Sequence, residues 1–158
     1  MTDTGLYIGS ALQGVDRKGR VAIPADFRTT IEKNSSARTV MVAFHPTLPC
    51  LRGFDSQWAA DAEADFRRRL LDGTDPAVIA AEREAAFGEV EQAPFDPSGR
   101  FIMPDFFRAE AQIEDRAFFI GSGPTFNVWA PALLMTHESV PDRVRRRCAH
   151  LMAGKARE

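Results

Sequence analysis

Residues 16–28 read DRKGRVAIPADFR, and the same pattern returns at residues 96–108 as DPSGRFIMPDFFR. The two segments align without a gap, and six of their 13 positions are identical at a constant separation of 80 residues. A repeat of this kind indicates an internal duplication. The chain is therefore expected to contain two copies of one structural unit. The identical pairs are Asp16 and Asp96, Gly19 and Gly99, Arg20 and Arg100, Pro24 and Pro104, Phe27 and Phe107, and Arg28 and Arg108.

Each copy is expected to fold as a turn, a short strand and a short helix. An Asp at the head of a turn accepts hydrogen bonds from later backbone N–H groups, and a Gly near its end supplies a positive φ. The apolar residues that follow form a strand, and the next Pro suits the first turn of a helix. The Phe one turn along that helix is expected to point into the core. The residues with structural roles in the motif are Asp16, Gly19, Pro24, Asp96, Gly99 and Pro104.

Apolar runs after each motif predict a further pair of strands. Residues 39–44 and 51–54 are rich in strand-forming residues after the first copy. Residues 117–120 and 126–129 have the same character after the second copy. The duplication therefore extends beyond the 13-residue motif.

Helices are predicted between the copies and after the second one. Apolar residues from Trp58 to Leu70 recur at helical spacing behind a start signal at Asp55, with acidic residues early and basic residues late, as the helix dipole prefers. A second helix is expected from about Pro76 to Phe87, and a last one from near Pro141.

Charge is segregated along the chain although the net charge is only −2. Residues 55–91 contain ten acidic and four basic residues, whereas residues 142–158 contain six basic and two acidic ones. Residues 16–28 contain four basic and two acidic residues and are also net positive. Because a phosphate responds to the local field rather than to the molecular average, the net charge does not exclude nucleic acid as a partner.

The sequence gives no sign of a membrane or secreted protein. No run approaches the roughly 18 consecutive apolar residues that a membrane span needs. Residues 1–9 lack a basic stretch followed by an apolar run, so no secretory signal is expected. The two cysteines, Cys50 and Cys148, do not make a disulfide framework. We therefore expect a cytoplasmic protein.

No catalytic or metal-binding set of residues is recognisable. His45, His137 and His150 lie far apart, and none has Cys or carboxylate neighbours at metal-binding spacing. No His with Asp or Asn is identifiable to activate Cys50. The glycine turn at residues 121–123 lacks the full pattern of a nucleotide-binding loop. We expect no enzymatic activity, no metal, no cofactor and no small-molecule substrate.

The Asp-x-x-Gly-Arg motif with its apolar strand, Pro and Phe-Arg ending, present twice around a helical linker, resembles the MraZ family of bacterial transcriptional regulators. The resemblance covers about residues 7–140. It implies an α+β fold in which two SpoVT/AbrB-like swapped-hairpin half-domains form a pseudo-two-fold β barrel. The expected parts are a first SpoVT/AbrB-like domain at residues 10–57, a helical linker at 58–85, a second such domain at 86–130 and a C-terminal helical segment at 131–158.

The resemblance also implies which residues contact DNA. The basic residues of the Asp-x-x-Gly-Arg turns correspond here to Arg17, Lys18 and Arg20 in the first copy and to Arg100 in the second. Pro97 and Ser98 replace Arg17 and Lys18, so the second turn has less charge than the first.

The function that the resemblance implies is sequence-specific regulation of transcription. The expected protein is a nucleoid-associated repressor of the division and cell-wall gene cluster, including its own promoter. Its partners are double-stranded DNA with repeated short sites and further copies of the chain, assembled as a homo-oligomeric ring.

Other interpretations stay open from the sequence alone. An AbrB-like protein-interaction or antitoxin-type oligomer would not contact DNA directly. The basic cluster at residues 143–147 is either a solvated helix face or a second basic patch. Arg28 and Arg108 are more consistent with a structural role than with DNA contact. The arginines at residues 67–69 are more consistent with stabilising the helix dipole and with pairing between protomers than with DNA contact.

Overall fold

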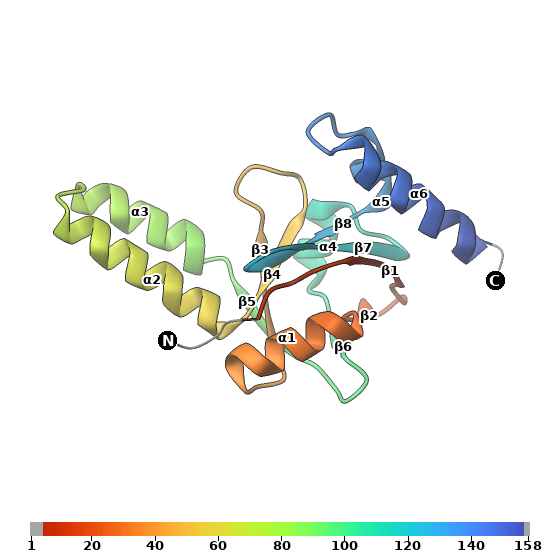
Figure 1. The fold of residues 1–158 in the computed structure, drawn as a ribbon, viewed down its shortest axis with the longest axis horizontal. Helices are drawn as coiled ribbons and strands as arrows, with labels where there is room; N and C mark the ends of the chain where they lie inside the picture. Colours follow the sequence, from red (N-terminus) through yellow and green to blue (C-terminus); the bar gives the residue numbers. More distant parts are fainter. Residues whose placement is uncertain (1–4, 157–158) are drawn as a thin grey trace.

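The computed structural model describes residues 5–156, which form an α+β fold, as the sequence predicts (Figure 1). The strands are β1 (Ser10–Gly14), β2 (Arg20–Ala22), β3 (Thr39–Phe44), β4 (Leu51–Phe54), β5 (Glu91–Pro94), β6 (Arg100–Ile102), β7 (Arg116–Ser122) and β8 (Thr125–Trp129). The helices are α1 (Ala25–Ser35), α2 (Ser56–Leu71), α3 (Pro76–Phe87), α4 (Asp105–Ala111), α5 (Pro131–Thr136) and α6 (Asp142–Ala156). Six strands form an antiparallel sheet in the order β1-β7-β8-β4-β3-β5, and β2 pairs antiparallel with β6 as a separate ribbon.

The sheet interleaves strands from the two copies of the repeat. Strand β1, which precedes the first motif, pairs with β7 of the second copy, and β5, which precedes the second motif, pairs with β3 of the first copy. Strands β4 and β8 join the two halves in the centre of the sheet. The strand order is therefore symmetric. When each strand is replaced by its counterpart in the other copy, the same order is read from the opposite edge of the sheet.

The expected β barrel is wrong for residues 5–156, whose six-stranded sheet is open and has β1 and β5 at its edges. The chain leaves each edge strand through a motif turn and enters the ribbon, and an isolated bridge between Val15 and Val21 lies at the first of these exits. The ribbon then packs across one face of the sheet instead of joining its edges, so the strands do not close into a ring.

Two apolar cores lie on opposite faces of the sheet, because neighbouring side chains of a strand point to opposite sides. Phe119 belongs to the core that the ribbon, α1 and α4 cover, whereas Phe118 belongs to the core under α5 and α6. Phe27 and Phe107 are 2% and 3% exposed in the first of these cores, which confirms the inward direction predicted for them.

The start of α2 is fixed by a buried carboxylate. Asp55 is the N-cap residue, as the sequence predicts, and its Oδ1 accepts a hydrogen bond of 3.0 Å from the backbone N–H of Trp58. Its Oδ2 accepts bonds from the Tyr7 hydroxyl at 2.5 Å and from Asn34 Nδ2 at 3.0 Å, so the buried charge is fully occupied. Helix α3 begins at Pro76, as predicted, and the α2–α3 hairpin projects away from the sheet (Figure 1).

Gly53 interrupts the apolar run of β4 for a packing reason. It stands opposite Phe126 of β8, and a Cβ at this position would lie 2.2 Å from the Phe126 ring. The missing side chain therefore makes room for an aromatic ring in the first core. None of the helices within residues 5–156 is both long enough and apolar enough to cross a membrane.

Candidate nucleic-acid interface

The first Asp turn, residues 16–20, is shaped by one carboxylate. Asp16 Oδ1 accepts hydrogen bonds of 2.9 Å from the backbone N–H groups of Lys18 and Arg20. Asp16 Oδ2 accepts a bond of 2.7 Å from Arg20 Nε. Gly19 has a φ of +86°, a conformation that a residue with a Cβ adopts at a cost. This geometry positions the backbone of Arg20 where β2 begins.

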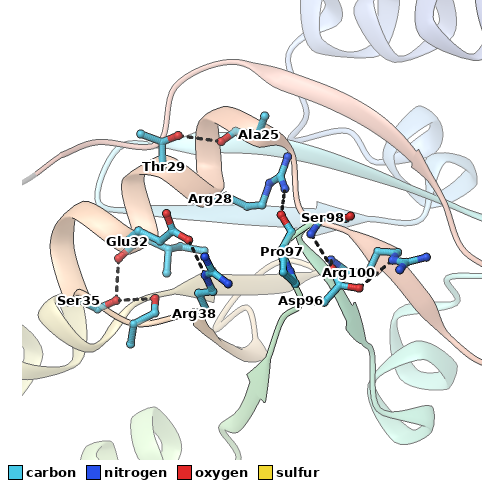
Figure 2. A network of polar contacts seen from close by, with 12 residues as sticks. Ala25, Arg28, Thr29, Glu32, Ser35, Arg38, Asp96, Pro97, Ser98 and Arg100 are labelled. Carbon is cyan, nitrogen blue, oxygen red and sulfur yellow. Dashed lines mark hydrogen bonds and ion pairs between the residues drawn. The ribbon is translucent and has the colours of Figure 1, made fainter.

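The second Asp turn, residues 96–100, repeats this arrangement (Figure 2). Asp96 Oδ1 accepts bonds of 2.9 Å from the backbone N–H groups of Ser98 and Arg100, and Arg100 Nε donates to Asp96 Oδ2 at 2.9 Å. Gly99 has a φ of +82°. The two turns thus have the same backbone shape although their sequences differ at the two positions between Asp and Gly.

Both Asp carboxylates are stabilised in their charged form. The backbone N–H of Arg20, followed by its side chain, holds the pKa of Asp16 below its usual value. The backbone N–H of Arg100 is likewise the main cause that lowers the pKa of Asp96. Because these oxygens already accept several hydrogen bonds, an Asp can lie at this surface without turning an unpaired carboxylate toward solvent.

The β2–β6 ribbon places Arg20 and Arg100 on one face. Arg20 pairs with Ile102, and Arg100 pairs with Ala22, and residues directly opposite in an antiparallel pair share a face. The alternate residues Val21 and Phe101 are buried in the core below. The side chains of Arg20 and Arg100 are 50% and 58% exposed, and both arginines line one shallow hollow of about 420 Å³.

Each copy also anchors the turn of the other copy. The backbone N–H of Ile23 donates to Gly99 O at 2.9 Å, and the N–H of Met103 donates to Gly19 O at 2.9 Å. Arg28 extends from α1 over Gly99, and its Nη1 donates to Pro97 O at 3.2 Å (Figure 2). Arg108 lies over Gly19 in the same way, with its Nη1 3.1 Å from the position of a Cβ there.

The sequence did not predict that Arg28 and Arg108 each cross to the turn of the other copy. Arg108 does approach Asp105 at 3.9 Å, but Arg28 binds a backbone carbonyl of the other copy instead. The available signal was that both arginines occupy identical positions in the repeat. The acid three residues earlier, Asp105, is present only in the second copy, so it could not explain both. Their packing against the turns indicates a structural role.

The two turns differ in charge. The first Asp turn has one acidic and three basic residues, whereas the second has one of each. Arg17 and Lys18 are exposed, and within residues 5–156 their side chains have no hydrogen bond or ion pair. The positive charge available to an anion is therefore concentrated at the first turn, while the arginine of each turn is paired with its own Asp.

The arginines of the α2–α3 hairpin have partners within the chain. Arg67 pairs with Glu63, Arg68 with Asp65, and Arg69 with Glu82 at 2.6 Å. Each of these three arginines therefore has an acidic partner within the chain, and Glu63 is shared with Arg83.

The two cysteines of the chain do not form a disulfide. Cys50 and Cys148 are free and buried, and burial raises the pKa of the Cys50 thiol to about 12. Within the part of the chain that the structure describes, no group of three His, Cys, Asp or Glu side chains could hold a metal ion.

Comparison with known proteins identifies relatives over most of the chain. No model of a known protein family matches it. The chain is 30% identical over 130 residues to the transcriptional regulator MraZ of Rickettsia typhi, covering 80% of this chain and 82% of the relative. It is 32% identical over 135 residues to that of Xanthobacter autotrophicus, with 83% and 81% covered, and 30% identical over 129 residues to that of Gluconacetobacter diazotrophicus, with 80% of each covered. At this identity and coverage, the chain belongs to the MraZ family of transcriptional regulators.

Proposed function

We propose that this regulator acts by binding double-stranded DNA through its two Asp turns, with the first turn supplying most of the phosphate contacts. The observation that carries the proposal is the ribbon, which presents Arg20 and Arg100 on one exposed face beside Arg17 and Lys18. A guanidinium group is planar and carries several donors, so Arg20 can keep its Nε on Asp16 and offer its other N–H groups to a phosphate.

The proposed architecture includes assembly of several copies. We assign SpoVT/AbrB-like swapped-hairpin units to residues 10–57 and 86–130, joined by the helical linker at 58–85 and followed by the helical segment at 131–158. The reciprocal pairing of β1 with β7 and of β5 with β3 supports this assignment. In a homo-oligomeric ring, several weak turns would engage one duplex together, so that avidity offsets a low affinity of each turn.

Phosphate contacts position a protein on DNA but do not read its sequence. We propose that specificity comes from repeated short sites whose spacing matches the spacing of turns on the oligomer. The proposed target is the division and cell-wall gene cluster, including the promoter of the protein's own gene, with repression as the outcome and the nucleoid as the location. Membership of the MraZ family supports this assignment.

The direct test is binding to a labelled duplex taken from just upstream of the protein's own gene. Arg20→Ala should weaken binding strongly, because it removes a cation and leaves Asp16 with its charge uncompensated. Arg83→Ala is the matched control, since Arg83 is also an arginine paired with a carboxylate, Glu63, but lies on the α2–α3 hairpin. Equal losses for the two variants would refute the site.

Salt dependence tests the phosphate mechanism separately. The logarithm of the binding constant should fall with the logarithm of salt concentration, with a slope of about −0.9 for each neutralised phosphate. A flat salt dependence in an anisotropy titration would exclude the mechanism and favour the alternative of an oligomer that binds only protein.

A further inference from the structure

We propose that the β2–β6 ribbon reads a base as well as phosphates, through an apolar spot formed by Ile102 and Pro94 that contacts the methyl group of a thymine in the major groove. The inference rests on the proposed function and deepens it, because it names the part of the DNA that the second copy of the repeat recognises. Phosphates are the same at every base pair, whereas a thymine methyl group distinguishes one base pair from the others.

Ile102 lies on the face of the ribbon that carries the arginines. It stands directly opposite Arg20 in the antiparallel pair, and Arg100 lies two residues before it on β6, so the three side chains share one face. Ile102 is 60% exposed, although its neighbours Phe101 and Met103 are 3% and 0% exposed. A duplex that contacts Arg20 and Arg100 therefore covers Ile102 as well.

The apolar spot lies beside the two cations. Ile102 and Pro94 line the hollow of about 420 Å³ that Arg20 and Arg100 also line, and Pro94 is exposed at the end of β5. Neither Ile nor Pro has a polar side-chain atom, so the spot gains from apolar contact and not from side-chain hydrogen bonds. The thymine methyl group is the apolar feature that base edges present in the major groove, which makes it the matching partner.

The first copy has no such spot. The positions equivalent to Ile102 and Pro94 are Ala22 and Gly14, which have one side-chain carbon and none. The first copy has instead the two additional basic residues of its Asp turn. Charge and apolar surface are therefore divided between the copies, as suits a first copy that binds phosphates and a second copy that reads a base.

The dimensions of the ribbon favour the major groove. Its two strands lie about 5 Å apart, and a two-stranded ribbon fits a groove about 12 Å wide but not the minor groove, which is about 6 Å wide. Arg20 and Arg100 occupy diagonal positions of the ribbon face, with Cβ atoms about 7–8 Å apart. Their long side chains can reach phosphates on both walls of the groove, while the shorter Ile102 faces the bases between them.

The test removes the methyl group from the DNA and the aliphatic side chain from the protein. In the labelled duplex from upstream of the protein's own gene, each thymine is replaced in turn by deoxyuridine, which lacks the methyl group and keeps the same hydrogen-bonding groups. Each duplex is titrated with the wild type, with Ile102→Ala and with Leu71→Ala.

The two variants are matched. Ile102→Ala is compatible with the ribbon, because Ala22 already occupies the equivalent position of β2. Leu71→Ala is the control, since Leu71 has the same number of carbon atoms as Ile102 and is 88% exposed, but lies on the α2–α3 hairpin.

We expect the wild type and Leu71→Ala to lose about fourfold in affinity at one or more thymines, which is the effect of one buried methyl-sized group. Ile102→Ala should bind the unmodified duplex at least about fourfold more weakly and should show no further loss at those thymines. Its salt slope should equal that of the wild type, because the substitution removes no charge.

Two outcomes on DNA would overturn the inference. One is wild-type binding that deoxyuridine leaves unchanged at every position, and the other is a methyl dependence that persists in full in Ile102→Ala. A loss of particle mass in Ile102→Ala, measured by light scattering, would overturn it as well, since the apolar spot would then bind another copy of the chain.

Arg20→Ala, measured in parallel, separates this inference from the proposed function. If Arg20→Ala weakens binding and lowers the salt slope while deoxyuridine has no effect on the wild type, only the role of Ile102 fails. If the wild type shows no salt-dependent binding, the proposed function fails and the inference about Ile102 falls with it.

Discussion

Replacing Gly99 by Ala probes how the two copies hold each other. Gly99 has a φ of +82°, and a Cβ there would lie 2.3 Å from Arg28 Cδ and 2.7 Å from Arg28 Nε. The substitution therefore has two effects: it places an L side chain in the left-handed region, and it displaces the arginine that crosses from the other copy. Gly73 is the matched control, because it has a φ of +96° but nothing within 4 Å of its Cβ position.

The magnitudes of the two effects can be estimated separately. The left-handed conformation costs about 1–2 kcal/mol for a residue with a Cβ. Displacing Arg28 loses its hydrogen bond to Pro97 O, about 1 kcal/mol, together with some packing of its stem. We expect Gly99→Ala to lower the free energy of unfolding by about 2–3 kcal/mol and Gly73→Ala by about 1–2 kcal/mol. At about 3 °C per kcal/mol for a chain of this size, Gly99→Ala should lower Tm by about 6–9 °C.

The assay is urea unfolding and thermal melting of both variants at one protein concentration, because assembly makes stability concentration-dependent. The variant Gly99→Ala/Arg28→Ala completes a double-mutant cycle, in which the loss from Gly99→Ala should shrink to the level of Gly73→Ala. Equal destabilisation by Gly99→Ala and Gly73→Ala in the wild-type background would show that Arg28 does not pack against the second Asp turn.

Two further predictions concern the polar groups that shape the fold. Tyr7→Phe removes the buried hydrogen bond to Asp55, so it should lower the free energy of unfolding by about 1.5–3 kcal/mol in urea melts at neutral pH, and an unchanged midpoint would contradict the role given to the hydroxyl. Asp16 and Asp96 have folded pKa values below the usual value of about 3.9, so their stabilising contribution is present above about pH 4 and is lost as the pH falls through their lower folded values. The difference in the free energy of unfolding between the wild type and Asp16→Asn/Asp96→Asn should therefore become smaller as the pH falls below about 4. A difference that stays constant would show that the charged, hydrogen-bonded carboxylates do not stabilise the fold.

The sequence predicted the elements with strong local signals. The strands at residues 39–44 and 51–54 and the helix at residues 76–87 appear within a residue or two of their expected bounds. The edge strands β1 and β5 were not predicted, because SALQG and EQAP show neither apolar alternation nor β-branched residues. Their pairing depends on β7 and β3 from the other copy, and Pro94 is tolerated because β5 lies at an edge.

The basic residues of the candidate site could be named from the sequence, but their arrangement could not. The repeat pointed to Arg20 and Arg100, yet only the register of β2 with β6 shows that the two side chains share a face. The spacing of residues in the sequence also does not predict two kinds of contact. Each of these arginines pairs with the Asp of its own turn, and Arg28 crosses to the turn of the other copy. Whether the sheet closes into a barrel also depends on where the ribbon packs. The number of predicted strands does not determine this position.

The reciprocal anchoring of the turns has a consequence for how the protein could evolve. In a dimer of identical single-copy chains, any change in one turn appears in both. Here the copies are covalently joined, so Asp16 and Asp96 can keep one backbone shape while charge varies independently around them. Lys18 and Ser98 occupy equivalent places in that shape and differ only in what they present to solvent. Because both copies belong to one chain, the two turns can differ in charge while they share one backbone shape.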